Sequence, residues 1–451
     1  MVMKKDISKI FKPNDIRGVY GSELTDDLAY KFGRAFVFYF KTRNVVVGRD
    51  MRLSSPKLCK AFINGVIDQG ANAVDIGLVS SDALYFATAL LNIPGAMITA
   101  SHNPSEYNGI KFSLAKAHPI NGKKDLEVIK GLIEEDSFKD CKRGKIIKKN
   151  ILDAYVRHVH SFVNLKNLKK MKVIVDAGNG MAGKFFPLVV KGLPIKVIPI
   201  DFKLDGRFPD HEANPSKRKN VLHLEAVMKK QGADFGVSFD GDFDRAVFVN
   251  EKAHRFDSSL VASLIIKSIL EKKSNGKFVY NTVMSKVVPE VIKMYNGEAF
   301  REKVGHTFIK KKMREIKADF GAENSGHFYY KNNFYTDSAI ITFLIVAELY
   351  SGYGGKFSDM MREFRKYRKI DEKSFKLRNK DGVLLKIEKY YSKKAVKVEH
   401  VDGLTLYFKD WWFNLRTSNT EPFVRLNLEA VNLKNMLEKK REVIKMIKKF
   451  D

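Results

Sequence analysis

Strand-like and helix-like segments alternate along most of this chain, and this alternation restricts the fold more than any other feature of the sequence. An apolar strand pattern at 44–48 precedes a helical pattern at 56–70 and a further strand pattern at 72–77. The alternation returns over 171–242 and again over 259–296. Strands that alternate with helices are typical of α/β layers with largely parallel, mixed sheets. The sequence therefore predicts three related α/β domains with mixed sheets.

The C-terminal part of the chain has a different pattern. Strand-like segments at 395–408, 411–417 and 423–430 come before one final helical segment, which predicts a small α+β domain. A chain of 451 residues is also too long for one hydrophobic core. We expect joints near 148, 250 and 366, and hence domains at 1–148, 149–250, 251–366 and 367–451.

Composition argues against several classes of function. The net charge of +29 attracts polyanions, but the lysines are spread along the chain and lack the interleaved aromatic residues that single-stranded nucleic acid needs. No run approaches the roughly 18 apolar residues that span a membrane, and the start of the chain lacks the apolar stretch of a signal peptide. Cys59 and Cys141 have no metal-ligand spacing, which indicates reduced thiols. We expect a cytoplasmic protein with no nucleic-acid or membrane partner.

The run "TASHNPSEYNGIKF" at 99–112 places a serine where a strand ends and a tight loop opens. Asn-Pro and Asn-Gly are turn formers, so we expect an exposed loop at 101–109. Ser101 is well placed there for chemistry, but serine and asparagine also cap helices and bond their own backbone. Taken alone, the run leaves both interpretations open.

A second loop, "SFDGDFDRAVFVN", holds Asp240, Asp242 and Asp244. In an extended segment this spacing points all three carboxylates the same way, and converging oxygens favour a hard cation such as Mg²⁺. An EF-hand is disfavoured because Arg245 stands where its turn needs glycine and because the flanks are strand-like. A plain acidic surface turn is the other alternative.

Two further loops are rich in short polar side chains. In "GAENSGHF", glycines frame a polar cluster made of Glu323, Asn324, Ser325 and His327. Such a cluster suits a polyhydroxyl ligand, although a solvated turn has the same composition. "RTSNTEPFVR" joins the forked guanidinium of Arg416 to the short donors of 417–420. It predicts a phosphate cradle, with a simple serine/threonine turn as the alternative.

The run "VIVDAGNGMAG" is a competing motif. Gly178, Gly180 and Gly183 follow a strand and precede a helix, and Asp201 ends the next strand. This spacing is close to a dinucleotide-binding fingerprint and makes an NAD-dependent enzyme the second hypothesis. Asp176 argues against that hypothesis, because a carboxylate directly before the glycines disfavours a nearby pyrophosphate.

Taken in order, the loops resemble those of the α-D-phosphohexomutase superfamily and, within it, the phosphomannomutase/phosphoglucomutase group. "TASHNP" resembles the phosphoserine loop, "DGDFDR" the metal loop, "GAENSGH" the sugar-binding loop and "RTSNTEP" the phosphate-binding loop. "NDIRG" at 14–18 and "GRDMRLSS" at 48–55 resemble the N-terminal signatures. The resemblance covers nearly the whole chain and implies four domains around a central cleft. In this family the glycine run belongs to the second domain and binds no nucleotide.

The resemblance also implies a role for each site residue. Ser101 would carry the phosphoryl group, and the residues around it would be His102, Lys111 and Arg17. A Mg²⁺ site would consist of a phosphoryl oxygen on Ser101 together with Asp240, Asp242 and Asp244. The remaining substrate-binding positions would be Arg245, His306, Glu323, Ser325, His327, Arg416, Ser418, Asn419 and Thr420.

The implied activity interconverts hexose 1-phosphate and hexose 6-phosphate through a phosphoserine and a hexose 1,6-bisphosphate, which also serves as activator. Asn324 in the sugar-binding loop favours mannose and glucose phosphates over glucosamine phosphate. Departures from the family pattern at Asn14, Thr417 and Ser338 bear on substrate choice and leave the chemistry intact. We expect sugar phosphates as the small-molecule partners, and a monomer or dimer.

Overall fold

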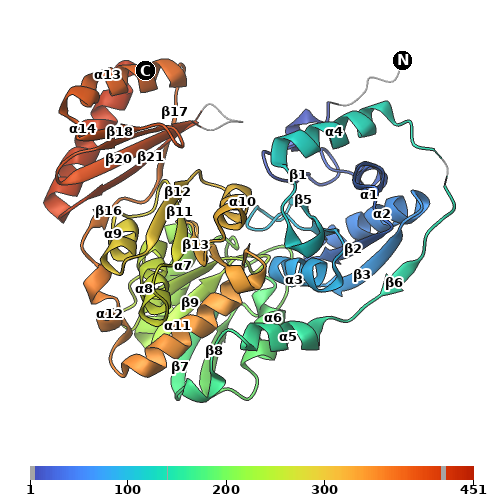
Figure 1. Ribbon diagram of the computed structural model, residues 1–451, viewed down its shortest axis with the longest axis horizontal. Coiled ribbons are helices and arrows are strands. Elements are labelled where there is room, and N and C mark those ends of the chain that lie inside the picture. The colour runs from blue at the N-terminus through green and yellow to red at the C-terminus, as the bar shows by residue number, and fades with distance from the viewer. Residues whose placement is uncertain (1–5, 140, 418–422) are drawn as a thin grey trace.

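The computed structural model describes residues 6–139, 141–417 and 423–451. Four β-sheets follow one another along the chain and define domains I to IV (Figure 1). This architecture, with three α/β domains and a C-terminal α+β domain, confirms the predicted fold class. Within the described residues, every helix is too short or too polar to cross a membrane.

Domain I has a mixed sheet of six strands that presents the serine loop at one end. Its strands lie in the order β1 (Ile16–Val19), β5 (Tyr107–Ser113), β4 (Gly95–Ile98), β2 (Asn44–Arg49), β3 (Asn72–Leu78) and β6 (Ile146–Lys148). β2 is parallel to β3 and β4, whereas β5 is antiparallel to β1 and β4. The helices are α1 (Asp26–Phe40), α2 (Ser55–Asp68), α3 (Ser81–Leu91) and α4 (Gly122–Glu135).

Domain II carries the acidic loop at the turn of a hairpin. Its strands lie in the order β10 (Ala246–Asn250), β9 (Phe235–Phe239), β7 (Met171–Asp176) and β8 (Ile195–Ile200). β9 and β10 are antiparallel, and the other pairs are parallel. The helices are α5 (Leu152–His160), α6 (Ala182–Val190) and α7 (Arg218–Gln231).

Domain III carries the "GAENSGHF" loop between two antiparallel strands, β13 and β14. Its strand order is β12 (Glu298–Glu302), β11 (Lys277–Asn281), β13 (Phe320–Ala322), β14 (Phe328–Tyr330) and β15 (Thr336–Asp337). The helices are α8 (Ser258–Lys272), α9 (Val287–Met294), α10 (His306–Ile316), α11 (Ala339–Tyr353) and α12 (Phe357–Met360).

In all four domains, short 3₁₀ turns connect these elements. They lie at Ser8–Ile10, Ala115–Ala117, Leu165–Asn167, Lys331–Asn333, Arg362–Phe364 and Ser392–Lys394.

Domain IV is an antiparallel sheet with two helices. Its strands lie in the order β16 (Arg368–Lys369), β21 (Phe423–Ala430), β20 (Trp411–Thr417), β19 (Leu404–Tyr407) and β18 (Lys397–Glu399), and β17 (Lys373–Lys376) also pairs with β21. The helices are α13 (Lys380–Tyr391) and α14 (Leu433–Phe450). α14 alternates buried apolar residues with lysines, as the amphipathic pattern of the sequence predicts.

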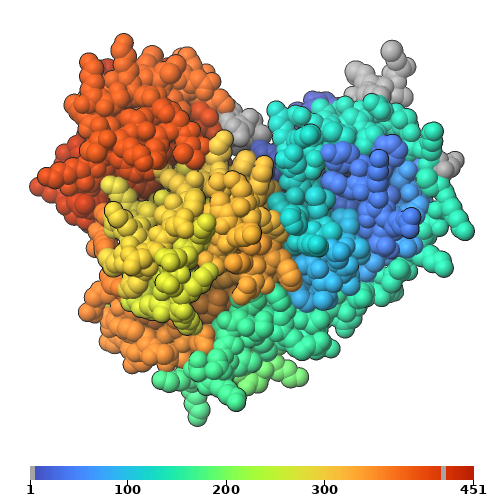
Figure 2. Space-filling model, in the orientation of Figure 1, coloured from blue at the N-terminus to red at the C-terminus, as the bar shows by residue number. Residues whose placement is uncertain are grey.

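One hydrophobic core runs through domains II and III and includes one face of the domain I sheet, whereas domain IV has its own. The ring of Phe235 in β9 lies 4.6 Å from that of Phe357 in α12 and 6.1 Å from that of Phe343 in α11. In domain IV, Trp411 and Phe413 pack in a separate cluster. Domains I, II and III are therefore joined by a shared core, and domain IV is attached to them as a separate unit. A hollow lies between domain IV and domain I in the view of Figure 2.

Candidate active site

Ser101 lies just past β4, where the backbone takes a left-handed turn. Its φ angle is +52°, a conformation that costs a residue other than glycine about 1 kcal/mol. Its amide donates to Thr99 Oγ1 at 2.9 Å, and the residue is fully buried. The hydroxyl donates to Asp240 Oδ2 at 3.1 Å and lies 3.2 Å from His102 Nδ1. The loop thus holds the serine oxygen against the acidic loop of domain II.

A buried arginine to which the sequence analysis assigns no role shapes the serine loop. Arg52 is fully buried, and its charge is balanced by Asp50 at 3.3 Å. Its guanidinium donates to the backbone carbonyls of Ser101, Asn103, Pro104 and Tyr107. Because a buried guanidinium is costly unless its donors are satisfied, these bonds fix the path of the loop. In the sequence, the cluster of charges in "GRDMRLSS" was the signal that could have pointed to this role of Arg52.

Three cations gather where the serine loop meets the acidic loop. Arg17 of β1 donates to Asn103 Oδ1 at 2.7 Å. Lys111 of β5 lies 2.6 Å from Asp242 Oδ2 and 2.8 Å from an oxygen of Asp244. The third cation, Arg245, follows the acidic loop directly and lies 3.5 Å from Asp240. The site therefore concentrates positive charge at the place where an anionic group on Ser101 would lie.

His102 is neutral in this environment. Burial lowers the pKa of His102 well below its usual value, and the cations Arg245 and Arg17 lower it further. A neutral imidazole has one donor and one acceptor nitrogen. His102 can therefore exchange a proton with a neighbouring hydroxyl.

Asp240, Asp242 and Asp244 converge, but for a different reason than the sequence predicts. The prediction assumed an extended segment with alternating side chains, whereas the structure has a tight turn between β9 and β10. Phe243 takes a left-handed φ of +67° and packs its ring 4.8 Å from that of Phe239. Asp240 Oδ1 accepts the amide of Asp244 at 3.0 Å, which closes the turn. One oxygen of each carboxylate lies within 4.8 Å of the others.

The electrostatics of this cluster suit a hard divalent cation. Burial and the neighbouring carboxylates raise the pKa of Asp240 well above its usual value. Oδ1 of Asp242 is buried, with no hydrogen-bond partner among the residues that the structure describes, and the neighbour of the buried Oδ1 of Asp244 is a histidine nitrogen at 3.3 Å. Buried carboxylate oxygens without partners are costly, and Mg²⁺ prefers ligands of this kind. The three aspartates therefore fit a magnesium ion.

The first turn of α3 adds a contact that the sequence did not indicate. Ser81 donates its hydroxyl to Asp242 Oδ2 and its amide to the Asp242 carbonyl, the latter at 3.0 Å. Negative charge is stabilised at the N-terminus of a helix. α3 therefore fixes Asp242 from domain I and leaves Oδ1 of that residue available. Nothing in the local sequence links positions 161 residues apart.

The "GAENSGHF" loop meets the acidic loop through His327. His327 Nε2 lies 3.3 Å from Asp244 Oδ1, and its Nδ1 lies 2.8 Å from the hydroxyl oxygen of Ser325. The carboxylate of Glu323 accepts the amide of Gly305 at 2.8 Å and the hydroxyl of Tyr329 at 2.6 Å. The structure thus brings Glu323, Ser325 and His327 to the aspartate cluster.

His306 begins α10, directly after Gly305. Both ring nitrogens of His306 are buried and have no partner within the described part of the chain. Burial lowers the pKa of His306 well below its usual value, and the charges of Lys310 and Lys111 add to this effect. A buried neutral ring without partners is suited to a polar ligand.

Arg416 lies near the end of β20 in domain IV. Its guanidinium lies 3.4 Å from Glu372 Oε2 and 3.6 Å from Asp402 Oδ2. Asp402 also accepts the amide of Val304 at 3.1 Å, so Arg416 lies close to the start of α10. Arg425, paired with Arg416 across β20 and β21, adds a second cation that the sequence analysis did not select. The predicted clamp residues Ser418, Asn419 and Thr420 lie outside the described residues.

Packing accounts for the glycines of the competing dinucleotide motif. A Cβ atom on Gly180 would lie 2.8 Å from the Gly241 carbonyl oxygen, and one on Gly183 would lie 2.0 Å from the Phe202 carbonyl oxygen. The amide of Met181 donates to the Gly241 carbonyl at 2.9 Å. These glycines therefore let the loop after β7 support the acidic loop, and the space that a pyrophosphate needs is filled.

Comparisons with known proteins identify the same family in all four domains. Family models described as phosphoglucomutase/phosphomannomutase α/β/α domains I, II and III match residues 8–140, 153–253 and 257–367, and the model of the C-terminal domain matches 369–445. A phosphomannomutase of Escherichia coli K12 is 36% identical over 93% of this chain and 94% of its own length.

Solved structures with a similar fold include a member of the same family. A phosphoglucomutase/phosphomannomutase family protein of Burkholderia thailandensis superimposes with a TM-score of 0.88 at 28% identity, over 98% of this chain and 97% of its own. Aspergillus fumigatus N-acetylphosphoglucosamine mutase, in complex with GlcNAc-6P and magnesium, shares the fold with a TM-score of 0.63 at 13% identity, over 97% and 95% of the two chains. The chain belongs to the phosphoglucomutase/phosphomannomutase family of the α-D-phosphohexomutase superfamily and is a hexose phosphate mutase.

Proposed function

We propose that this mutase interconverts hexose 1-phosphate and hexose 6-phosphate, with mannose or glucose as the hexose, through a phosphoserine at Ser101 and a hexose 1,6-bisphosphate. The position of Ser101 carries the proposal. Its buried hydroxyl lies 3.1 Å from Asp240 Oδ2, between the acidic loop and three cations. Phosphoryl transfer depends mainly on alignment and charge neutralisation, and this position supplies both.

In the first transfer, the free hydroxyl of a hexose phosphate attacks the phosphorus of phospho-Ser101. The bond from phosphorus to Ser101 Oγ breaks as the bond to the sugar oxygen forms. The proton lost by the sugar hydroxyl ends on Ser101 Oγ, carried by His102, whose Nδ1 lies 3.2 Å from that oxygen, or by Lys111. Arg17 and Lys111 stabilise the charge on the transferring oxygens.

The three aspartates would hold Mg²⁺ together with a phosphoryl oxygen on Ser101, and when bound the ion would neutralise charge on the transferring group. Asp242 is already oriented for this by Ser81, and Asp240 by the backbone of the turn. The fumigatus mutase, which is bound to magnesium and a sugar phosphate on the same fold, supports this assignment.

The bisphosphate then turns end over end and returns its other phosphate to Ser101. The phosphate that is not reacting would be held by Arg416, Ser418, Asn419 and Thr420 of domain IV. Glu323 and Ser325 would bind hydroxyls that both orientations present, with Arg245, His306 and His327 completing the site. Free hexose 1,6-bisphosphate would act as activator, because it can phosphorylate Ser101 again after a premature release.

The replacement Ser101→Ala tests the mechanism. It removes the oxygen that accepts the phosphoryl group, so we expect turnover to be abolished and any phosphate adduct to disappear from the intact mass. Ser105→Ala is the matched control, because Ser105 is an exposed serine of the same loop. Full activity of the Ser101→Ala protein would overturn the mechanism.

Substrate choice is tested by a coupled assay with the 1-phosphates of mannose, glucose and glucosamine, each with catalytic bisphosphate. The proposal expects the highest specificity constants for mannose and glucose. A higher kcat/KM for glucosamine 1-phosphate than for both others contradicts it.

A further inference from the structure

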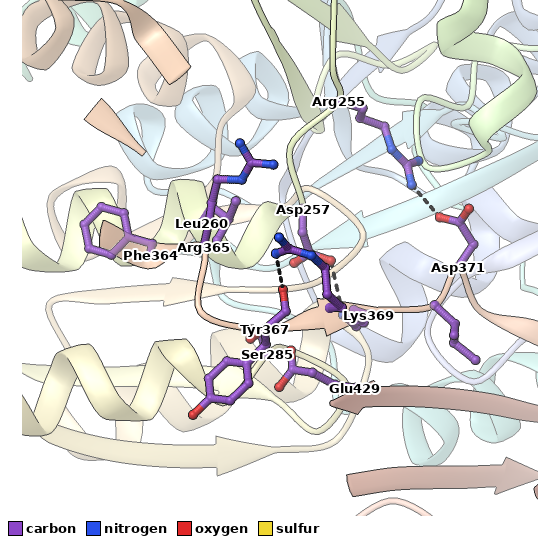
Figure 3. Close-up of a pocket in the computed structure, with 12 residues that line it drawn as sticks. Arg255, Asp257, Leu260, Ser285, Phe364, Arg365, Tyr367, Lys369, Asp371 and Glu429 are labelled. Atoms are coloured by element: carbon purple, nitrogen blue, oxygen red, sulfur yellow. Dashed lines mark hydrogen bonds and ion pairs between the residues drawn. The ribbon is translucent and has the colours of Figure 1, made fainter. Parts of the chain in front are cut away.

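The segment that joins domain III to domain IV contacts the sugar-binding loop by two separate routes. We call residues 367–371 the hinge segment and residues 321–327 the sugar-binding loop. Beside the hinge segment lies a cavity of about 250 Å³ (Figure 3). Its charged lining includes Arg255, Asp257, Arg365, Arg368, Lys369 and Asp371. Two of these side chains, Lys369 and Asp371, begin the two routes.

The first route is direct. The ammonium of Lys369 donates to Asn324 Oδ1 of the sugar-binding loop and to Asp257 Oδ2, the latter at 3.3 Å. The Lys369 side chain is only 9% exposed. A lysine this buried needs partners for its charge, and losing one is costly. Burial would raise the pKa of Asp257, but Lys369 and the bond from Ser259 hold it below its usual value.

The second route runs through domain II. Asp371 forms an ion pair with Arg255 at 2.6 Å, which Figure 3 shows at the other side of the cavity. The same guanidinium donates to the Ser216 carbonyl at 3.0 Å, and the Ser216 hydroxyl donates to the Ser325 carbonyl, also at 3.0 Å. This route therefore ends one residue further along the sugar-binding loop than the first.

The hinge segment is packed against domain IV and would move with it. Between the two charged residues, the amide of Ile370 donates to the Leu428 carbonyl of β21 at 3.0 Å, and the Ile370 side chain is buried in the core of that domain. Any rotation of domain IV therefore moves Lys369 and Asp371 with it. The side-chain oxygen of Asn324 accepts from the hinge segment, whereas the neighbouring side chains of Glu323 and Ser325 bond Tyr329 and His327.

We propose that Lys369 and Asp371 are positioning residues that couple the orientation of domain IV to the conformation of the sugar-binding loop. The proposal rests on the proposed function, since it links the phosphate clamp of domain IV to the loop that would bind the sugar hydroxyls. Such coupling is reciprocal: whatever orders one side orders the other by the same free energy. The two ends of the substrate are then bound and released together.

Kinetics of single variants give the first test. Lys369→Met breaks the first route, and we expect it to lower kcat/KM for hexose 1-phosphate about tenfold, as the loss of a hydrogen bond to a charged group implies. Asp371→Asn removes the charge from the second route, and we expect a smaller loss of about twofold to fivefold, because that ion pair is exposed to solvent. Lys369→Arg should restore most of the first loss. Arg368→Met is the matched control, because Arg368 lines the same cavity from the same strand and, among the described residues, its side chain bonds only the carbonyl of Tyr367.

Double variants separate the routes. Adding Asn324→Ala to Lys369→Met should cost little more, because both changes break the same route. Adding Asn324→Ala to Asp371→Asn should multiply the two losses, because the routes differ. Multiplied losses in the first pair, or Arg368→Met as impaired as Lys369→Met, would overturn the coupling.

Hydrogen exchange tests the coupling without any assay of turnover. In Lys369→Met, amides of the sugar-binding loop should exchange faster, and in Asn324→Ala those of the hinge segment should do so. Arg368→Met should leave both segments unchanged. If the wild-type protein lacks the proposed activity but the two variants show these exchange effects, the proposed function fails and the coupling stands. Unchanged exchange in both variants overturns the coupling even in an active enzyme.

Discussion

At the scale of single residues, the site is a balance of buried charges. Three carboxylates of the acidic loop face Lys111 and Arg245, and the charge of Arg17 also acts on Asp242 and Asp244. Lys111 forms short ion pairs with Asp242 and Asp244, so it holds these side chains in the arrangement that a cation also needs. Removing one partner from such a cluster costs more than the pair contributes, because the other charge stays buried.

Replacing Asp242 by asparagine should weaken metal activation. The change keeps the shape of the side chain but removes a negative oxygen, the strongest partner of Lys111. We expect the half-saturating Mg²⁺ concentration to rise about tenfold or more, equivalent to at least one hydrogen bond to a charged group. Titration of activity with Mg²⁺ measures it, and Asp153→Asn, on an exposed position of α5, is the control. An unchanged half-saturation point would place the metal elsewhere.

At the scale of elements, short connecting segments hold the acidic loop in place. The segment between β8 and α7 is itself held by His211, whose Nε2 lies 3.2 Å from Asp176 at the end of β7 and 3.5 Å from Asp201. Two residues later, the Ala213 carbonyl accepts the amide of Gly241 at 3.3 Å. The acidic loop is therefore supported by residues from two connections of domain II, the one after β7 and the one after β8.

The support from His211 should depend on pH. Burial alone would lower the pKa of His211, but Asp176 and Asp201 raise it to about 9. A histidine with a raised folded-state pKa contributes stability that is complete below its unfolded value, about 6.5, and is lost as pH rises through 9. The free energy of unfolding of wild type should therefore exceed that of His211→Gln at pH 7. We expect this difference to shrink by pH 10 in urea titrations; a constant difference would contradict the assignment.

Sequence reasoning located the elements and the short loops, and failed where contacts are distant. The loop at 101–109 was expected to be exposed, but Ser101 and Asn108 are buried and the loop runs into β5 from Tyr107. Alternating patterns located the strands because each is a local property of a few residues. The serine loop and the aspartates were found because polar groups are crowded there. The convergence of the aspartates was predicted from the wrong backbone, since the left-handed turn at Phe243 depends on a buried packing site for its ring. Arg52, Ser81 and Lys369 were missed because their partners are far away in the sequence.

At the scale of the whole molecule, the site is divided between two bodies. The serine, acidic and sugar-binding loops belong to domains I to III, whereas Arg416 belongs to domain IV, which has a separate core. A substrate that contacts all of these loops must bring the bodies together. Rotation of domain IV, together with the hinge segment, about the joint near residue 366 is the movement that the connectivity allows.

Arg416→Ala should weaken substrates of both kinds. Arg416 would hold whichever phosphate is not reacting, so 1-phosphate and 6-phosphate should lose binding alike, by about 1.5–3 kcal/mol. The bisphosphate should also escape more often and raise the demand for added activator. Kinetics in both directions measure this, with Arg441→Ala, an exposed arginine of α14, as control. A loss in one direction only, beyond what the reaction equilibrium requires, would place the clamp elsewhere.

The separate core of domain IV has a consequence for optical measurements. The chain contains two tryptophans, Trp411 and Trp412, and both lie in domain IV. Trp412 donates its Nε1 hydrogen to Glu429 at 2.8 Å, and Glu429 in turn accepts the amide of Lys286 from domain III at 3.0 Å. Ultraviolet emission from this enzyme therefore originates mainly in the domain that has a separate core, close to its contact with domain III. The chain carries an intrinsic fluorophore at that joint, so closure and melting of domain IV can be followed without an attached dye.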